Sequence, residues 1–512
     1  MFEFSLGEEV LMRMENDVVV VGAGPVGLML AAELALAGVR VRVFEQRARR
    51  TEQSRALTLH PRSLELLDQR GIVDRFVRRG VSIPSAHFAG LDTRLDFSRL
   101  PTSHPYTLFL PQVHTEELLE ERARELGVQV DREHTLVDLA QTDDAVALRV
   151  QGPGGELEVR ARHAVGCDGA GSAVRRAIGV DFPGSATTRT AILGDVVLSD
   201  PPARPVSRTN AQGLLLLVPL GDGAHRIVVV DPSRAQVPVA EPVTLDELRG
   251  SVTRILGTDL GMHAPRWLSR FGDATRLAER YRVGRVFLAG DAAHMHFPAG
   301  GQGLNVGLQD ATNLGWKLAA AVHGWAPPWL LDSYHDERRP IGEALARNTT
   351  AQGKLMDVSP EGLALRELFD GLLGFPAVQR KLAGLISAID VAYPAADGAH
   401  PLVGRRVPDL HLTSERGPQR LYTSLHAGRF VLLGRPEDDL ELRDAAAPWR
   451  DRVELVLATF ATQDELEGAT RLLIRPDGHV AWAGDDVSSL GAVLPLWCGP
   501  AAIRGPRPAA GE

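Results

Sequence analysis

A run of four valines followed at once by a glycine-rich turn and an apolar segment restricts this chain to few folds. Val18 to Val21 indicates a buried strand, and Gly22 to Gly27 follows it in G-x-G-x-x-G spacing. The segment from about Pro25 to Ala37 is apolar and has the length of a helix, and Val39 to Glu45 alternates as a second strand. This order predicts a βαβ unit of the Rossmann type.

Each glycine of the motif has a separate expected task. Gly22 permits the tight turn, Gly24 lets the backbone approach a pyrophosphate, and Gly27 lets helix and strand pack closely. The phosphates then lie against the positive end of the helix. Glu45, which ends the second strand, can accept hydrogen bonds from the hydroxyls of an adenosine ribose. The motif alone does not separate FAD from NAD, and a strand-to-helix turn without a ligand is the alternative.

Two further glycine elements distinguish FAD from NAD. The first is Cys167-Asp168-Gly169, and the second runs from Gly290-Asp291 to Asn305. Asp291 follows a buried strand, and its carboxylate can bind a chain of hydroxyls. The glycines near position 301 leave backbone N–H groups free before a helix that begins near Leu304, whose start carries partial positive charge. Such a helix start suits the pyrimidine edge of a reduced flavin, and the Asn305 side chain could bind the same edge. Three elements in this order predict one long ligand, FAD.

Length and pattern indicate several domains. A chain of 512 residues is too long for one core. We expect an α/β protein: a Rossmann-like FAD-binding domain, an inserted and mostly antiparallel β-sheet substrate domain, and a C-terminal thioredoxin-like α/β domain. The last lacks Cys-x-x-Cys, which excludes a thiol redox role. The expected FAD-binding domain covers 14–182, with a substrate-domain excursion near 83–110, and resumes with a helical linker over 271–398; the substrate sheet covers 183–270 and the thioredoxin-like domain 399–512.

Composition excludes several classes of function. The net charge is −9 without a long basic run, so neither nucleic acid nor an anionic membrane is an expected partner. Two cysteines, Cys167 and Cys498, exclude a disulfide scaffold and a cysteine-rich metal site, and no metal is expected. The first residues lack a secretory pattern, so we expect a cytoplasmic protein. A small basic cluster at Arg47, Arg49 and Arg50 is either a solvated loop or an attraction for a phosphate-bearing cofactor. The oligomeric state stays open, with a homodimer as one option.

At this point the sequence resembles a known family. Ser54-Arg55-Ala56, Leu110-Pro111-Gln112, Gly166 to Gly169 with Ser172 and Arg175, and Arg285 to Leu318 are similar to the group A flavoprotein monooxygenases, whose prototype is p-hydroxybenzoate hydroxylase. The similarity is strongest to the actinobacterial branch of aromatic polyketide hydroxylases and rifamycin-modifying monooxygenases, and it covers nearly the whole chain. By position the resemblance implies a set of FAD contacts. With the motif residues this set is Gly22, Gly24, Val26, Gly27, Glu45, Gln46, Arg55, Gln112, Asp168, Asp291, Pro298, Gly301, Gln302, Gly303, Leu304 and Asn305.

The resemblance also implies the reaction. NADPH would reduce the flavin, and O2 would then give a flavin C4a-hydroperoxide that transfers oxygen to an electron-rich aromatic ring. Pro298 would line the catalytic side of the flavin. Phe88, Leu216 and Phe297 are candidate contacts for a planar aromatic substrate, although a place in the ordinary core is the more common role for such residues. No second dinucleotide motif is visible, so NADPH is expected to bind transiently. His294 and His296 flank the flavin loop, where a structural role is the more common one.

Several alternatives remain. A flavin-dependent halogenase would need a Trp-x-Trp-x-Ile-Pro element, which Trp325-Ala326-Pro327-Pro328-Trp329 does not supply. A Baeyer–Villiger oxygenase on the same scaffold stays open, as does a non-enzymatic FAD-binding module. Among hydroxylases, biosynthesis of a polycyclic polyketide and inactivation of a rifamycin-type drug are both compatible. The sequence does not distinguish NADPH from NADH and does not name a proton-transfer residue.

Overall fold

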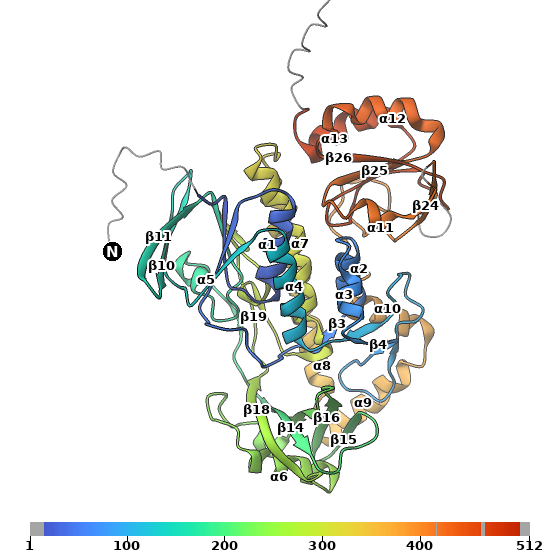
Figure 1. The fold of residues 1–512 in the computed structure, drawn as a ribbon. Helices are drawn as coiled ribbons and strands as arrows, with labels where there is room; N and C mark the ends of the chain where they lie inside the picture. Colours follow the sequence, from blue (N-terminus) through green and yellow to red (C-terminus); the bar gives the residue numbers. More distant parts are fainter. Residues whose placement is uncertain (1–14, 416, 462–465, 502–512) are drawn as a thin grey trace, which may run out of the picture.

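The structure, a computed structural model, describes residues 15–501 apart from 416 and 462–465 (Figure 1). The expectation that no secretory signal is present concerns residues before this range. The predicted α/β class is confirmed, with the inserted antiparallel sheet at the bottom of the view and the C-terminal domain at the top right (Figure 1).

A six-stranded sheet forms the centre of the first domain. Its strand order is β20-β21-β12-β1-β2-β8, and β1 pairs in parallel with β2 on one side and β12 on the other. Only β20 runs antiparallel to its neighbour. All four valines of β1 are buried, as expected of a central parallel strand. The bounds are β1 Val18–Val21, β2 Val41–Glu45, β8 Gln129–Arg132, β12 His163–Gly166, β20 Arg282–Val283 and β21 Val286–Leu288.

Helices cover this sheet. α1 (Pro25–Leu36), α4 (Gln112–Glu125) and α7 (Gly303–Val322) lie side by side (Figure 1), and α1 packs against both of the others. Because α1 is almost entirely apolar, it is buried along most of its length. An antiparallel three-stranded sheet and the short helix α5 complete this region. Their bounds are β9 Thr135–Gln141, β10 Val146–Gly152, β11 Gly155–Ala161 and α5 Ala173–Ala177.

The inserted sheet has its own core. Its order is β15-β16-β17-β14-β18, with every neighbouring pair antiparallel. One face packs against α6 (Leu245–Leu256), which begins where the Thr244 side chain accepts a hydrogen bond from the Glu247 N–H and ends at the left-handed Gly257. The strands are β14 Thr190–Leu198, β15 Val206–Asn210, β16 Gly213–Pro219, β17 Ala224–Val230 and β18 Met262–Gly272.

Short strands and helices connect the two sheets. Residues 86–100 pack in one apolar cluster with α8, α9 and α10. Pro360 and Pro376 each stand at the first position of a new helix, since proline starts helices better than it continues them. The bounds are β3 Thr58–Leu59, α2 Pro61–Asp68, α3 Val73–Val77, β4 Val81–Ile83, β5 Ser85–Ala86, β6 Leu95–Asp96, β7 Thr107–Phe109, β13 Gly184–Ser185, β19 Thr275–Leu277, β22 His294–Met295, α8 Ser333–Leu355, α9 Pro360–Leu372 and α10 Pro376–Ser387.

The C-terminal domain is built on a four-stranded mixed sheet of order β26-β25-β27-β28. β25 pairs in parallel with β26 and antiparallel with β27, which is the expected thioredoxin-like arrangement. The predicted hairpin around Pro476-Asp477-Gly478 is confirmed as β27–β28. The bounds are β23 His411–Ser414, β24 Gly417–Arg420, α11 Leu421–Ser424, β25 Phe430–Gly434, α12 Asp439–Ala446, β26 Val453–Leu457, β27 Arg471–Ile474, β28 Val480–Gly484 and α13 Leu490–Cys498.

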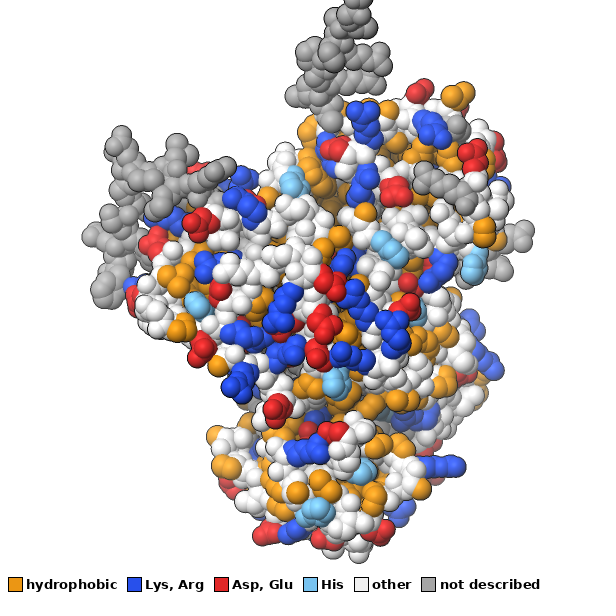
Figure 2. All heavy atoms as spheres, viewed as in Figure 1, with side chains coloured by type: hydrophobic (Ala, Val, Ile, Leu, Met, Phe, Trp, Pro, Cys, Tyr) orange, Lys and Arg blue, Asp and Glu red, His pale blue; other side chains and the backbone are white. Residues whose placement is uncertain are grey.

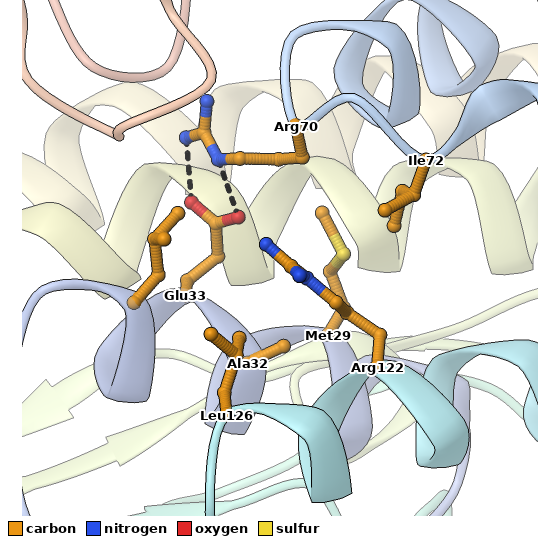
Figure 3. A pocket seen from close by; sticks show the side chains of 8 residues that line it. Met29, Ala32, Glu33, Arg70, Ile72, Arg122 and Leu126 are labelled. Carbon is orange, nitrogen blue, oxygen red and sulfur yellow. Dashed lines mark hydrogen bonds and ion pairs between the residues drawn. The ribbon is translucent and has the colours of Figure 1, made fainter.

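Buried charges attach this domain to the first one. Arg475 donates to Glu337 of α8, which also accepts from Lys317 of α7 at 2.7 Å. Figure 3 shows a second pair, Arg70 and Glu33, beside a small hollow between α1 and the segments around it. Arg70 also donates to the carbonyl of Pro476 at 2.8 Å. The hollow is thus lined by residues of the first domain, and Arg70 among them is bonded to the β27–β28 hairpin through Pro476.

Candidate active site

The three glycine elements meet at one edge of the central sheet. β1, β2, β12 and β21 are parallel, so their carboxyl ends share that edge, where open α/β sheets bind ligands. The Cys167 N–H donates to the Val21 carbonyl at 2.8 Å, and the Ala289 N–H donates to the Gly166 carbonyl at 3.0 Å. These bonds bring the first glycine loop, Asp168 and the loop that carries Asp291 together.

The glycines of the first loop differ in their surroundings. Gly22 has φ +106°, and a Cβ on it would lie 2.4 Å from the Cys167 carbonyl oxygen. A Cβ on Gly27 would lie 2.0 Å from the Gly22 carbonyl oxygen. A Cβ on Gly24 would meet nothing within 4 Å. Gly22 and Gly27 are therefore required by the fold, whereas Gly24 faces open space at the start of α1, where a pyrophosphate fits.

Val26 joins this loop to the later glycine elements. A Cβ on Gly290 would lie 2.9 Å from a Val26 methyl, and a Cβ on Gly307 would lie 2.5 Å from the same methyl. Gly290 itself has φ +63°. The close approach of α1 to α7 therefore depends on these small residues, and it places the start of α7 beside the first glycine loop.

Glu45 closes the far side of the loop. Its carboxylate accepts hydrogen bonds from the Ala23 N–H at 2.9 Å and the Arg47 N–H at 3.0 Å. A carboxylate has further lone pairs, so it can still accept from a ribose. Gln46 beside it is exposed.

The segment with Arg55 lies between Gln112 and the start of α7. The Gln112 side chain accepts from the Ala56 N–H at 3.0 Å and donates to Glu116 at 2.7 Å, so both ends of its amide are engaged within the protein. Arg55 is exposed and forms no hydrogen bond or ion pair with any other residue of the described chain. It is a cation without an internal partner among the described residues, which leaves it available for the phosphate role that the resemblance implies.

Two aspartates at this edge differ in their surroundings. The Asp168 carboxylate accepts from Ser172 Oγ, the Ala173 N–H and the Val174 N–H, at 2.6, 2.6 and 3.2 Å. It therefore caps α5. Asp291 is exposed, and within the described ranges it has no hydrogen bond or ion pair. Its carboxylate is available to the hydroxyls of a ligand.

The start of α7 supplies free donors. Gly300 and Gly301 have φ +70° and +64°, and a Cβ on Gly301 would lie 2.4 Å from Thr58 Oγ1. The N–H groups of Gly303 and Leu304 precede that of Val306, which donates to the Gln302 carbonyl at 2.9 Å, so they have no intrahelical acceptor and can serve an anion. The Gln302 side chain is buried and bonded to Ala299 and Asn348.

The expectation for the Asn305 side chain is wrong. Its oxygen accepts from the His60 N–H and Ser63 Oγ, each at 2.7 Å, and its nitrogen donates to the carbonyls of Thr58 and Gly301. An amide has no further capacity. Asn305 therefore fixes the loop, and only its backbone N–H remains for a cofactor.

Of the three residues predicted to contact the substrate, one lies in the core and two are partly exposed. Phe88 is buried and stacks on Phe369 with ring centroids 5.6 Å apart, so it is a core residue instead of the expected substrate contact. Phe297 is half-buried and lies 5.9 Å from the Phe271 ring of the inserted sheet, next to the exposed Pro298. Leu216 is half-buried on the sheet face away from α6. Two of the three thus lie where sheet and flavin loop face each other.

The buried residues that fix the loop carrying Asp291 were not predicted from the sequence. Asp310 accepts from the Gly290 N–H at 3.1 Å, from His294 at 2.8 Å and from Arg338 at 2.7 Å. Burial raises the pKa of Asp310, but Arg338 and His294 outweigh it and keep the pKa below its usual value. The available signal was that Asp310 is the one acidic residue within α7.

His60 was missed as well. Burial lowers its pKa to about 4, so the ring is neutral near pH 7. Its Nε2 lies 2.8 Å from the Gly300 carbonyl oxygen, and the ring therefore donates to that carbonyl and fixes the glycine turn.

Charged side chains of both signs are interspersed on the face seen in Figure 2. Over the ranges that the structure describes, no helix is sufficiently long and apolar to cross a membrane. The same ranges contain no group of three or more His, Cys, Asp or Glu side chains placed to hold a metal ion.

Comparisons with known proteins identify the family of this chain. A family model described as "FAD binding domain" matches residues 15–349, and one described as "Aromatic-ring hydroxylase, C-terminal" matches residues 400–501. The chain is 52% identical over 483 residues to the uncharacterized aromatic compound monooxygenase YhjG of Bacillus subtilis, covering 93% of this chain and 95% of the relative.

The names of two other similar proteins state the compound on which each acts. The rifampicin monooxygenase of Streptomyces venezuelae is 48% identical over 490 residues, which cover 95% of this chain and 99% of the relative. The solved structure of OxyS anhydrotetracycline hydroxylase from Streptomyces rimosus matches with a TM-score of 0.89 and 47% identity, covering 95% of this chain and 100% of that one.

Proposed function

Because the chain belongs to the family of FAD-binding aromatic-ring hydroxylases and is a flavin-dependent monooxygenase, we propose that it hydroxylates a planar, electron-rich polycyclic aromatic compound of the polyketide type. NADPH is the proposed electron donor and O2 the second substrate. The relatives named for rifampicin and anhydrotetracycline support a large fused-ring substrate.

The observation that carries the proposal is the position of the free donors. Gly24 follows β1 and the exposed Asp291 follows β21 at the same edge of the sheet, and the start of α7, with its free N–H groups, packs beside α1. They suit a pyrophosphate, a hydroxyl chain and an electron-rich ring edge, in that order. FAD held there would supply the redox chemistry that activates oxygen.

The chain itself has three tasks in this reaction. Arg55 and the start of α1 would offset the charge of the phosphates. The start of α7 would stabilise negative charge on the bound ring. The apolar sheet face opposite Phe297 would exclude water and orient the aromatic substrate.

The exposed Arg47 and Arg49 lie next to the Glu45 end of β2. Two cations there would attract a phosphate-bearing cofactor. A transient visit suits a chain in which no second dinucleotide motif is visible.

A panel experiment tests the proposal. The FAD-loaded protein is mixed with polycyclic phenols, rifamycins and simple phenols, with NADPH or NADH, and cofactor oxidation, peroxide and product mass are measured together. We expect a gain of one oxygen coupled to NADPH consumption for a fused-ring phenol. NADPH oxidation that yields only peroxide for every compound would contradict it.

Two outcomes would favour the alternatives. Conversion of rifamycins alone would indicate drug inactivation. Oxygen inserted into a carbon–carbon bond, seen as a ring-expanded or ring-opened product, would indicate Baeyer–Villiger chemistry.

A further inference from the structure

Two buried arginine–carboxylate pairs lie on opposite faces of the inserted sheet. Arg270 of β18 pairs with Glu247 of α6 at 2.8 Å, and the arginine side chain is 1% exposed. Arg226 of β17 pairs with Asp195 of β14 through two hydrogen bonds, the longer at 2.7 Å, and its side chain is 2% exposed. The two pairs are chemically alike and differ in what surrounds them.

Strand register assigns the faces. Ile227 lies opposite Gly194, and both belong to the face that packs on α6. Side chains alternate along a strand, so Arg226 and Asp195, which lie directly opposite each other, belong to the other face. Trp267 is the partner of Asp195 on β18 and shares that face.

The Arg270 pair has a clear structural task, because it attaches the first turn of α6 to the sheet. Arg234 reinforces it by donating to the same Glu247 carboxylate at 2.8 Å. Arg226 and Asp195 have no such task, since they join two strands that backbone hydrogen bonds already pair. Taking two charges out of water costs several kcal/mol per ion, about as much as their pairing returns. A buried pair without a structural task points to a ligand.

The face around Arg226 is only partly covered by protein. Leu216, Val218, Trp267 and Phe271 on it are half-buried, whereas Leu215 and Leu217 on the opposite face are fully buried. Phe271 meets Phe297 of the flavin loop. Figure 2 shows hydrophobic side chains gathered where the lower lobe joins the rest of the molecule.

The arginine itself is oriented toward a further acceptor. Its Nε and Nη2 donate to Asp195, and the guanidinium carbon lies 5.1 Å from the centre of the Trp267 ring. Nη1 has no hydrogen-bond partner among the residues that the structure describes. Asp195 and Trp267 thus fix the plane of the guanidinium and leave one nitrogen free.

We propose that Arg226 binds a hydroxyl or phenolate oxygen of the aromatic substrate, with Asp195 as the residue that positions it. This rests on the proposed function. The Asp195 charge neutralises the guanidinium, so the pair suits one ionisable oxygen on a planar ring and does not require a carboxylate or phosphate. Donation from Nη1 favours the ionised form of that oxygen. An ionised hydroxyl enriches the ring in electrons, which is what an electrophilic oxygen transfer needs.

The test uses two probes that differ by one hydroxyl, 2-hydroxyanthraquinone and anthraquinone. Binding to the oxidised FAD-loaded protein is measured by titration, and ionisation of the bound hydroxyl is followed by its visible absorbance against pH. We expect the wild type to prefer the hydroxylated probe about tenfold, which corresponds to about 1.4 kcal/mol, and to lower the pKa of the bound hydroxyl, because a hydrogen bond from a charged donor is strongest to an ionised oxygen.

Variants test whether Arg226 causes the preference and the pKa shift. Arg226→Met should remove both the preference and the pKa shift, and Arg226→Lys should keep part of each. Arg270→Met, which breaks the equivalent pair on the other face, should keep both in full. Urea unfolding of each holoenzyme identifies any variant that fails to fold, and Asp195→Asn then replaces Arg226→Met, with a reduced preference as its expected result.

Each outcome decides one question. If wild type prefers the hydroxylated probe and Arg226→Met retains that preference, this inference is wrong while the proposed function stands. The same holds if wild type binds both probes equally. If wild type binds neither probe, the proposed substrate class is wrong and this inference fails with it.

Discussion

The Asp310 carboxylate and the Arg338 guanidinium lie 2.7 Å apart, with both side chains fully buried. This pair joins α8, which carries Arg338, to α7, which carries Asp310. The second carboxylate oxygen of Asp310 accepts a hydrogen bond from the Gly290 N–H. Arg338 also donates to the hydroxyl of Tyr393 at 3.2 Å. The loop that presents Asp291 is thus fixed by buried contacts to α7 and α8.

Asp310→Asn should destabilise the protein and weaken FAD binding. Removing one member of a buried ion pair leaves an uncompensated charge and costs about 3–5 kcal/mol. Urea unfolding of the apoprotein and a fluorescence titration with FAD measure the two effects. Asp332→Asn is the control, since its pair with Arg282 leaves the aspartate 71% exposed, and such pairs contribute about 0–1 kcal/mol. Equal unfolding curves for the two variants would contradict the assigned role.

Gly24→Ala and Gly27→Ala should fail in different ways. Gly24 has φ −75° and open space, so an alanine leaves the apoprotein intact and obstructs only the phosphates of a ligand. Gly27 has no room for a methyl group, so an alanine lowers the stability of the apoprotein itself. Thermal unfolding without FAD, followed by flavin titration, separates them. A Gly24→Ala protein that binds FAD like wild type would show that the open space is not the pyrophosphate site.

Asp291→Asn should reduce FAD affinity without changing apoprotein stability. Asp291 makes no hydrogen bond or ion pair within the part of the chain described, so its loss should alter the free energy of unfolding by less than about 0.5 kcal/mol. Hydrogen bonds to a charged group contribute about 1.5–3 kcal/mol, so the affinity should fall at least about tenfold. Asp168→Asn is the informative comparison, because the Asp168 carboxylate caps α5 and its loss should also lower stability.

Glu337 should make stability depend on acid pH. Burial raises its pKa, but Arg475 and Lys317 lower it further, to about 2 against an ordinary 4.5. A depressed carboxylate pKa gives stability that is complete above pH 4.5 and is lost as pH falls toward 2. The shift corresponds to about 3 kcal/mol. The stability difference between wild type and Glu337→Gln in urea should therefore shrink between pH 6 and pH 3, whereas Glu343→Gln, on the exposed side of the same helix, should show little difference at either pH.

Deleting the chain after Ala399 should impair solubility more than FAD binding. Trp316, Ala320 and Leu330 of the first domain share one core cluster with Phe430 and Leu432 of the C-terminal domain. Truncation exposes that surface and leaves Lys317 and Glu337 without Arg475. Soluble yield and flavin content of the purified protein give the comparison. A soluble, monodisperse truncated protein would contradict the prediction.

The sequence reveals the parts of this site that are local. The tight packing at Gly22 and Gly27 and the open space at Gly24 follow from spacing, because strand, turn and helix are contiguous and their geometry is fixed within a few residues. Glu45 and Asp291 follow from their place at strand ends. The three-domain order follows from the change from helical to alternating pattern.

The remainder depends on contacts between distant segments. Asn305 resembles a ligand donor in sequence, yet His60 and Ser63, more than 200 positions away, occupy its amide. The Asp310–Arg338 pair and the Arg226–Asp195 pair join helices and strands whose relative placement no spacing encodes. Phe88 is an aromatic residue of the kind that lines substrate pockets, and only its packing against α9 shows that it lies in a hydrophobic core.

The inserted sheet carries a hydrophobic core supplied only by residues between Ile192 and Leu268, apart from that of the central sheet. The face of the sheet toward Phe297 can therefore be changed by substitution, while the face packed on α6 keeps the strands in place. A combinatorial library at Leu216, Val218, Trp267 and Phe271, or a graft of the whole insertion from a relative, should alter which molecules are accepted and leave the cofactor machinery as it is. Such enzymes are suited to diversify by exchange of one cassette.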